Sequence, residues 1–306
     1  MALHRLEDRG AAEKNRDPGR NSRLISLLLL IISLVILLYP VVSTVWNDYQ
    51  NSEIARKYDE ELSKIGSPEV FADLWRRAEE YNDHLDATGH HYRPEDPDDP
   101  EYQDYKSQLL PSERSSVMAR ITIPDISVDL PVYHGTTDNV LYRGAGHMYG
   151  SDLPLGGEGN TAAITAHTGM VNASMFDNLG KLEEGQPVYI NVLGETLRYR
   201  MTGSEVVKPD DYDAVTYEDG VDKLVLITCT PYGINSDRLL VTAVRDTSPI
   251  TADELPGGWR PQLSWWMKLD LALIATIIAI ALWSSLYRKR KQKQAEEDQP
   301  EAQALV

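Results

Sequence analysis

The chain contains one cysteine, Cys229, at a position that suits a reactive thiol. It follows the apolar run 223–228, which predicts a β-strand, and precedes the turn-forming run Thr-Pro-Tyr-Gly. The end of a strand holds a side chain in place and leaves it open to solvent. A single cysteine excludes an internal disulfide and a thiolate metal site. Two interpretations remain: a buried structural cysteine or a nucleophile.

A cysteine nucleophile needs a general base, and acyl transfer also needs a donor for the developing oxyanion. His167 follows the apolar strand predicted over 161–166 and is the base best placed by sequence. His147 is the second candidate, although a structural role in a turn suits it better. Arg238 opens the next predicted strand, so the intervening loop can bring its guanidinium to the sulfur. The sequence does not show whether these side chains meet.

Two uncharged apolar runs flank this region, 24–46 with 23 residues and 271–287 with 17. About 20 apolar residues cross a bilayer as a helix. Lys and Arg cluster before the first run and after the second, which predicts that both termini are cytoplasmic. The expectation is a two-pass protein of the cell membrane with residues 47–268 outside. The alternatives are a cleaved signal peptide for the first run and a buried core helix for the second.

Charge narrows the range of partners. Asp and Glu total 47 and Lys and Arg total 30, so the net charge is −17. A nucleic-acid-binding protein would carry a basic surface, so we expect no nucleic acid partner. The apolar fraction of 42% is ordinary for a globular protein and excludes general disorder.

Between the apolar runs, the sequence pattern changes twice, from helical spacing to a proline-rich acidic stretch and then to alternating strands. Apolar residues at three- to four-residue spacing predict helices within 47–85, and the proline-rich acidic stretch 86–116 cannot continue them. Such a stretch is either a linker or a functional lid. From Ala119 onward, short alternating strands with Gly and Pro turns predict a closed barrel or a sandwich. The expected segments are 1–23 cytoplasmic, 24–46 membrane, 47–85 helices, 86–116 lid, 117–248 barrel, 249–270 linker, 271–287 membrane and 288–306 basic cytoplasmic tail.

The segment around the cysteine, LITCTPYGINSDRLLV over 226–241, closely resembles the active-site strand, loop and strand of sortases, and its form is typical of class C. Further sortase-like segments follow in the family's order: IPDI (123–126), LPVYHG (130–135), GHMYGSDLPLGG (146–157) and AHTG (166–169). The resemblance covers residues 119–246, and the two apolar runs also look like class C.

This resemblance implies a mainly β fold, an eight-stranded sortase-type barrel with N-terminal helices and two transmembrane helices. It implies Cys229 as nucleophile, His167 as general acid and base, and Arg238 as oxyanion or substrate binder. Thr228 and Thr230, beside the cysteine, are expected to support the substrate or the oxyanion. No cofactor is expected, and no metal site is assigned. The acidic run 210–213 could bind calcium but equally fits a solvated loop.

Class C sortases often carry a lid whose Asp-Pro-aromatic motif occupies the cleft. Here the motif is imperfect, so two aspartates and two tyrosines are lid candidates: Asp96, Asp99, Tyr92 and Tyr102. The alternative is a solvated acidic linker.

The resemblance implies a membrane-bound cysteine transpeptidase that cleaves a Leu-Pro-x-Thr-Gly-like sorting signal and joins it to a pilin lysine amine. Its partners would be pilin subunits or surface proteins bearing that signal, the lysine acceptor and the lipid bilayer. One alternative is a housekeeping sortase that attaches surface proteins to peptidoglycan. Another, of a different class, is a non-catalytic membrane scaffold of the pilus machinery.

Overall fold

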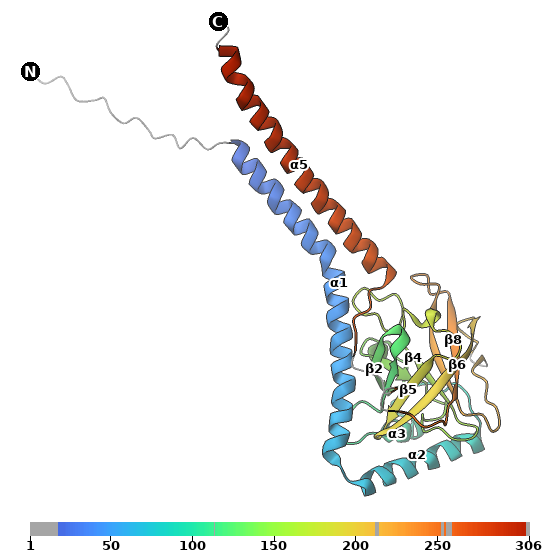
Figure 1. The fold of residues 1–306 in the computed structure, drawn as a ribbon. Helices are drawn as coiled ribbons and strands as arrows, with labels where there is room; N and C mark the ends of the chain where they lie inside the picture. Colours follow the sequence, from blue (N-terminus) through green and yellow to red (C-terminus); the bar gives the residue numbers. More distant parts are fainter. Residues whose placement is uncertain (1–17, 113, 212–213, 252–253, 255–258, 304–306) are drawn as a thin grey trace, which may run out of the picture. The chain divides into compact units, whose positions relative to one another are not determined.

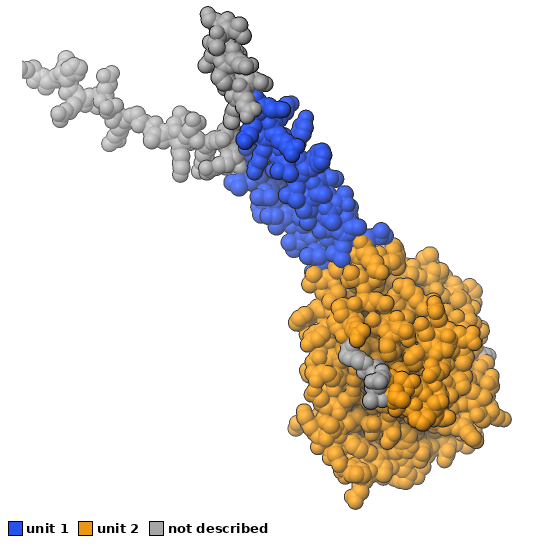
Figure 2. Space-filling model, in the orientation of Figure 1, with its two compact units in different colours: residues 1–39, 269–306 blue, residues 40–268 orange. Residues whose placement is uncertain are grey.

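The computed structural model describes residues 18–112, 114–211, 214–251, 254 and 259–303, with side chains described between residues 22 and 294 of these ranges. The chain forms two compact units. One comprises residues 1–39 and 269–306, and the other comprises residues 40–268 (Figure 2). All of the candidate catalytic residues belong to the second unit.

Two long apolar helices supply the candidate membrane spans: α1, Pro18–Ile65, and α5, Trp265–Gln303. The segments Ser22–Ile65 and Trp265–Gln294 are long and apolar enough to cross a bilayer, with mean hydropathies of 2.9 and 2.1. Only 6% and 0% of their most apolar stretches are buried, so neither stretch is packed as the core helix of a soluble domain. Both helices are compatible with membrane anchoring.

The later part of α1 and the helix α2, Pro68–Thr88, pack on the barrel as the apolar spacing predicts. The Tyr58 hydroxyl donates to the carbonyl oxygen of Met118 at 3.0 Å and accepts from the backbone N–H of Leu193 at 2.9 Å. These two bonds join α1 to two parts of the barrel. The apolar stripe of α2 buries Ala78, Tyr81 and Leu85. Burying a large apolar side chain stabilises the fold by about 1.5–3 kcal/mol.

Eight strands close into a barrel in the order β1-β2-β3-β4-β7-β8-β6-β5. Figure 1 shows strands of this barrel, with α2 running below them in that view. Their bounds are β1 Ala119–Ile123, β2 Val128–His134, β3 Ala145–His147, β4 Thr161–Thr165, β5 Pro187–Val192, β6 Glu195–Val207, β7 Lys223–Thr230 and β8 Asp237–Arg245. Closure leaves no unpaired sheet edge, and aliphatic side chains such as Ile121, Leu226 and Val241 fill the core. The expected eight-stranded sortase-type barrel is confirmed. The short strand β3 has no counterpart among the strands predicted from alternation, because Ala-Gly-His lacks the branched residues that mark a strand.

The stretch 86–116 is more ordered than its composition suggests. It contains the helix α3, Pro100–Ser107, which begins at the N-cap residue Asp99. The Tyr105 hydroxyl, fully buried, donates to the carbonyl oxygen of His147 at 2.9 Å and lies 3.0 Å from its Nδ1. The Nε2 of His147 lies 2.7 Å from the carbonyl oxygen of Asp152. Burial lowers the pKa of His147 to about 4, so this ring is neutral and joins α3 to the barrel.

Candidate active site

The register of the antiparallel pair β7 and β8 places Cys229 directly opposite Arg238. Directly opposed residues of an antiparallel pair project from the same face, with Cβ atoms about 4.5–5.5 Å apart. Both residues are half-buried. The guanidinium of Arg238 donates to the backbone oxygens of Asn235 and Asp237, at 3.4 and 3.2 Å. A hydrogen bond from Lys208 and, less strongly, the positive charge of Arg238 lower the pKa of the neighbouring Asp237 carboxyl, but among the residues that the structure describes no salt bridge to Arg238 is formed.

His167 approaches Cys229 from β4, on the side of β7 opposite to β8. The strands β4 and β7 run parallel, with Thr165 opposite Ile227, so two further residues along each strand bring His167 level with Cys229. The hydroxyl of Thr228 donates to the carbonyl oxygen of Ala166 at 2.8 Å and fixes the two strand ends together. Neighbouring strands therefore carry base, nucleophile and cation in that order.

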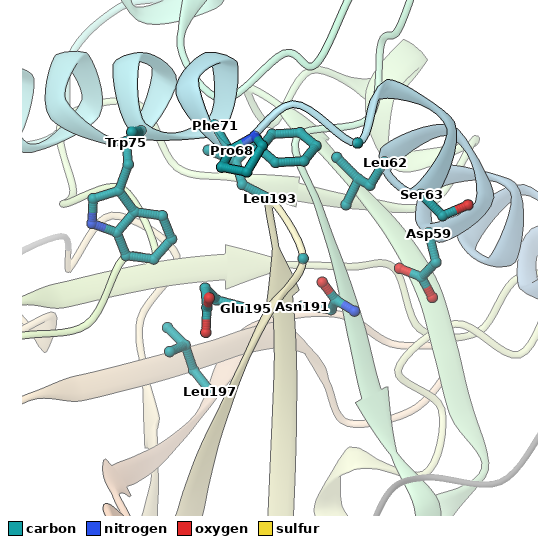
Figure 3. A pocket seen from close by; sticks show the side chains of 13 residues that line it. Asp59, Leu62, Ser63, Pro68, Phe71, Trp75, Asn191, Leu193, Glu195 and Leu197 are labelled. Carbon is teal, nitrogen blue, oxygen red and sulfur yellow. The ribbon is translucent and has the colours of Figure 1, made fainter.

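The three side chains line one cavity of about 310 Å³. Its remaining wall is mixed, with apolar residues and with charged groups at the mouth: Tyr92, Thr136, Asp138, Leu141, Met148, Thr165, Ala166, Val207, Lys208, Pro209, Asp211, Val215, Ile227, Thr228 and Leu240. A larger groove of about 860 Å³ lies between the α1–α2 turn and the β5–β6 hairpin (Figure 3). That groove contains none of the three candidate catalytic residues.

The surroundings of His167 prepare it to act as a base. Its Nε2 is buried and has no hydrogen-bond partner among the described residues. The ring of Tyr142 packs against the imidazole at 5.3 Å between centroids. Burial lowers the pKa of His167, and the carboxylate of Asp138 opposes that effect. A neutral imidazole with an unpaired nitrogen can take the proton of a thiol.

Comparison with known proteins identifies the family. The sortase domain family matches residues 121–246. Sortase C-1 from Actinomyces oris is 43% identical in structure-based alignment, which covers 60% of this chain and all of that chain, with a TM-score of 0.55. The chain belongs to the sortase family. Sortase C from Streptococcus pneumoniae is 33% identical, with 65% of this chain and all of that chain covered and a TM-score of 0.55.

Curated relatives of this sortase-family chain match over a smaller share of their own length. Sortase A from Staphylococcus aureus is 34% identical over 126 residues, which are 40% of this chain and 60% of the relative. The chain thus spans about 60% of the length of the first curated relatives that it matches. Members of the sortase family are cysteine transpeptidases, and solved structures of class C sortases are among the neighbours.

The structure separates the four lid candidates. Tyr92 lines the cavity that contains Cys229, and Asp96, Asp99 and Tyr102 are not part of its lining. Asp96 accepts from the backbone of Asp98 at 2.9 Å, and Asp99 accepts from the backbone N–H of Glu101 at 3.0 Å as the cap of α3. These two carboxylates serve local turns.

Tyr102 is a buried residue of α3, and its hydroxyl donates to Glu95 at 3.1 Å. Glu95 also accepts from the backbone N–H and, at 3.0 Å, from the hydroxyl of Thr136, a residue of the cavity wall. Sequence reasoning missed Glu95, because nothing in its neighbourhood marks it. This carboxylate fastens the stretch 86–116 beside the candidate active site.

The two threonines beside the cysteine also differ. Thr228 lines the cavity, but its hydroxyl is held by the backbone oxygen of Ala166. Thr230 is half-buried and lies outside the lining. Of the acidic run 210–213, the third and fourth residues lie outside the described ranges.

Asp177 is a further residue that the sequence did not reveal. Its carboxylate accepts from the Thr168 hydroxyl at 3.1 Å and from the Gly169 backbone at 2.8 Å, both next to His167. Its charge also acts on the hydroxyl of Tyr232, in the loop that follows Cys229. Asp177 is therefore a positioning residue that holds the loop carrying His167. Burial raises its pKa to about 6.

We expect the substitution Asp177→Asn to lower kcat while changing thermal stability little, because the amide keeps one oxygen for the Thr168 and Gly169 donors but loses the negative charge that strengthens both hydrogen bonds. In the wild type, the carboxylate gains a proton as the pH falls through about 6, so activity should decline there. The asparagine variant has no such proton to gain and should lack that decline. Profiles of kcat against pH test this, with the exposed Asp125→Asn as control. If kcat fell equally at acid pH in the wild type and in Asp177→Asn, the positioning role of Asp177 would be contradicted.

Proposed function

We propose that this chain is a two-pass membrane transpeptidase that cleaves a Leu-Pro-x-Thr-Gly-like sorting signal and joins it to a lysine amine of a pilin. The observation that carries the proposal is that His167, just beyond the end of β4, lines one cavity with Cys229 of β7 and Arg238 of β8. Two findings support the pilin assignment. Class C sortases are among the solved neighbours, and the S. pneumoniae sortase C has pilin substrates.

In the first half-reaction, the thiolate of Cys229 attacks the threonine carbonyl carbon of the signal. Arg238 stabilises the resulting oxyanion or holds the substrate beside it. The bond to the glycine nitrogen breaks, and imidazolium His167 gives that nitrogen its proton. The products are a thioester on Cys229 and a free amine.

In the second half-reaction, an incoming amine attacks the thioester carbonyl. His167 takes a proton from that amine, the carbon–sulfur bond breaks, and the thiolate leaves. A new amide joins the two proteins. Transfer in preference to hydrolysis requires that the thioester be shielded from water. We expect Tyr92, which lines the cavity, and the stretch held by Glu95 to provide that shield.

The acceptor decides between pilus assembly and attachment to peptidoglycan. The full chain in detergent micelles is incubated with a sorting-signal peptide and two acceptors, a pilin-derived lysine peptide and a peptidoglycan cross-bridge amine. Mass spectrometry of the product should show an isopeptide bond to lysine. Exclusive use of the cross-bridge amine would still support a transpeptidase but would contradict the pilin lysine as its acceptor. Formation of neither product would favour a non-catalytic scaffold.

The lid proposal predicts that Tyr92→Ala makes Cys229 react faster with a small thiol reagent, because the substitution opens the cavity wall. Removal of 90–105 should also raise the rate, but it would expose the core beneath Tyr102 and Tyr105. The point substitution is therefore the sharper test. His91→Ala, at an exposed neighbouring position, is the matched control. Equal labelling rates in Tyr92→Ala and wild type would refute a lid at this residue.

A further inference from the structure

Three metal-binding side chains from distant parts of the sequence meet at the end of α2. Asp86 lies in the last turn of α2, His90 opens the stretch that leads to Tyr92, and Asp152 lies between β3 and β4. One ligand atom from each lies within 4.8 Å of the others. The Nε2 of His90 is 2.7 Å from Asp152 Oδ1 and 3.4 Å from Asp86 Oδ1. None of the three lines the cavity that contains Cys229.

The separations suit a small divalent cation. Zinc bonds of about 2.0–2.1 Å in tetrahedral geometry place neighbouring ligand atoms about 3.3 Å apart. The Asp86–His90 separation matches that value. The shorter His90–Asp152 contact is a direct hydrogen bond, which a metal ion would replace by displacing the ring proton.

The surrounding structure holds these ligands in place. The ring of Tyr217 stacks on His90 at 4.0 Å between centroids, with an interplanar angle of 19°. Asp152 is buried, and its Oδ2 accepts from the backbone N–H of Thr161 at 2.7 Å, which leaves Oδ1 facing the histidine. The side chains of His90 and Asp152 are 12% and 3% exposed, so the site is closed on the barrel side. The side chain of Asp86 is 68% exposed, so the site is open to solvent on the side of α2.

An independent observation also points to a cation here. Asn160 lines the same small cavity as Asp86 and Asp152 and is only 8% exposed. Its amide nitrogen donates to the carbonyl oxygen of Leu153 at 3.0 Å, while its buried Oδ1 has no hydrogen-bond partner among the described residues. A buried oxygen without a donor is costly unless a ligand satisfies it. Three more carboxylates line this cavity and add negative charge: Glu79, Asp83 and Glu158.

We propose that Asp86, His90 and Asp152 form a zinc site, with the Asn160 oxygen as a nearby polar partner. An imidazole nitrogen among oxygen donors favours zinc over calcium, which takes oxygen ligands alone. The ion would fasten the end of α2 to the loop between β3 and β4. The proposal does not depend on the function proposed above, because the site uses none of the catalytic residues.

Isothermal titration of the full, untagged chain in detergent with zinc chloride tests the site. The protein carries Cys229→Ala, because Cys229 and His167 together could bind zinc themselves. We expect one zinc ion per chain and a higher Tm with zinc than without it. Asp86→Asn and His90→Gln should each weaken binding at least about tenfold, the effect seen even for residues that only support metal ligands. Asp86 is exposed, so its variant should fold normally.

His91→Gln is the matched control and should bind zinc as the parent does, since His91 is the exposed neighbour of the proposed ligand. Calcium at the same concentration should not displace zinc. The proposal is overturned if no saturable binding occurs, or if Asp86→Asn and His90→Gln both bind like the control. Displacement of zinc by an equal concentration of calcium would overturn the choice of metal.

Discussion

The substitution Cys229→Ala is expected to abolish cleavage of a sorting-signal peptide, with a loss in kcat on the order of 10⁴-fold or more, as found when other hydrolytic sites lose their nucleophile. The reason is chemical: no other thiol exists in the chain. His167 and Arg238 would remain in place, but they would have no sulfur to activate. Release of the glycine-containing fragment, followed by liquid chromatography, measures the rate.

The alanine variant should fold like the wild type, because Cys229 is half-buried and forms no hydrogen bond that the structure records among its described residues. Equal Tm values and far-ultraviolet circular dichroism would establish that the loss is chemical. Cleavage at more than a few per cent of the wild-type rate would contradict a role for Cys229 as nucleophile.

The second large effect is expected at Arg238. Removal of an oxyanion donor costs about 10²–10³-fold in kcat in other acyl-transfer sites, so Arg238→Ala should lose activity on that scale. Arg238→Lys should recover part of it, since lysine keeps the charge but lacks the planar fork of donors. Arg245→Lys, at the other end of β8, is the control and should retain activity.

The kinetic pattern separates the two roles left open for Arg238. A fall in kcat at unchanged KM indicates oxyanion stabilisation, whereas a rise in KM at unchanged kcat indicates substrate binding. If Arg238→Ala had the kcat and KM of the wild type, Arg238 would have neither role.

The local part of the site could be predicted from sequence, and the long-range part could not. The apolar run before Cys229 and the strand that opens at Arg238 are adjacent in sequence, so a hairpin-like pair was foreseeable, and the structure has it. The position of His167 depends on the parallel pairing of β4 with β7, which are separated by two other strands in the chain. No local pattern encodes that pairing. The family resemblance implied the role of His167 without that pairing.

The stretch 86–116 shows the limit of composition most clearly. Its prolines and carboxylates suggested a segment without regular structure, and the resemblance to class C sortases implied an Asp-Pro-aromatic motif in the cleft. In the structure, Asp99 caps α3, and Tyr105 anchors that helix to His147 in the core. The contact of Glu95 with Thr136 likewise joins segments that are 41 residues apart in sequence, so only the folded arrangement reveals it.

The intact mass of the full chain, after brief incubation with a sorting-signal peptide and no amine acceptor, is the sharpest test for a thioester on Cys229. We expect an added mass equal to that of the fragment acid ending in threonine less one water, located on Cys229, removable by hydroxylamine and absent from Cys229→Ala. Peptide cleavage without such an adduct, or an equal adduct in wild type and Cys229→Ala, would contradict that thioester.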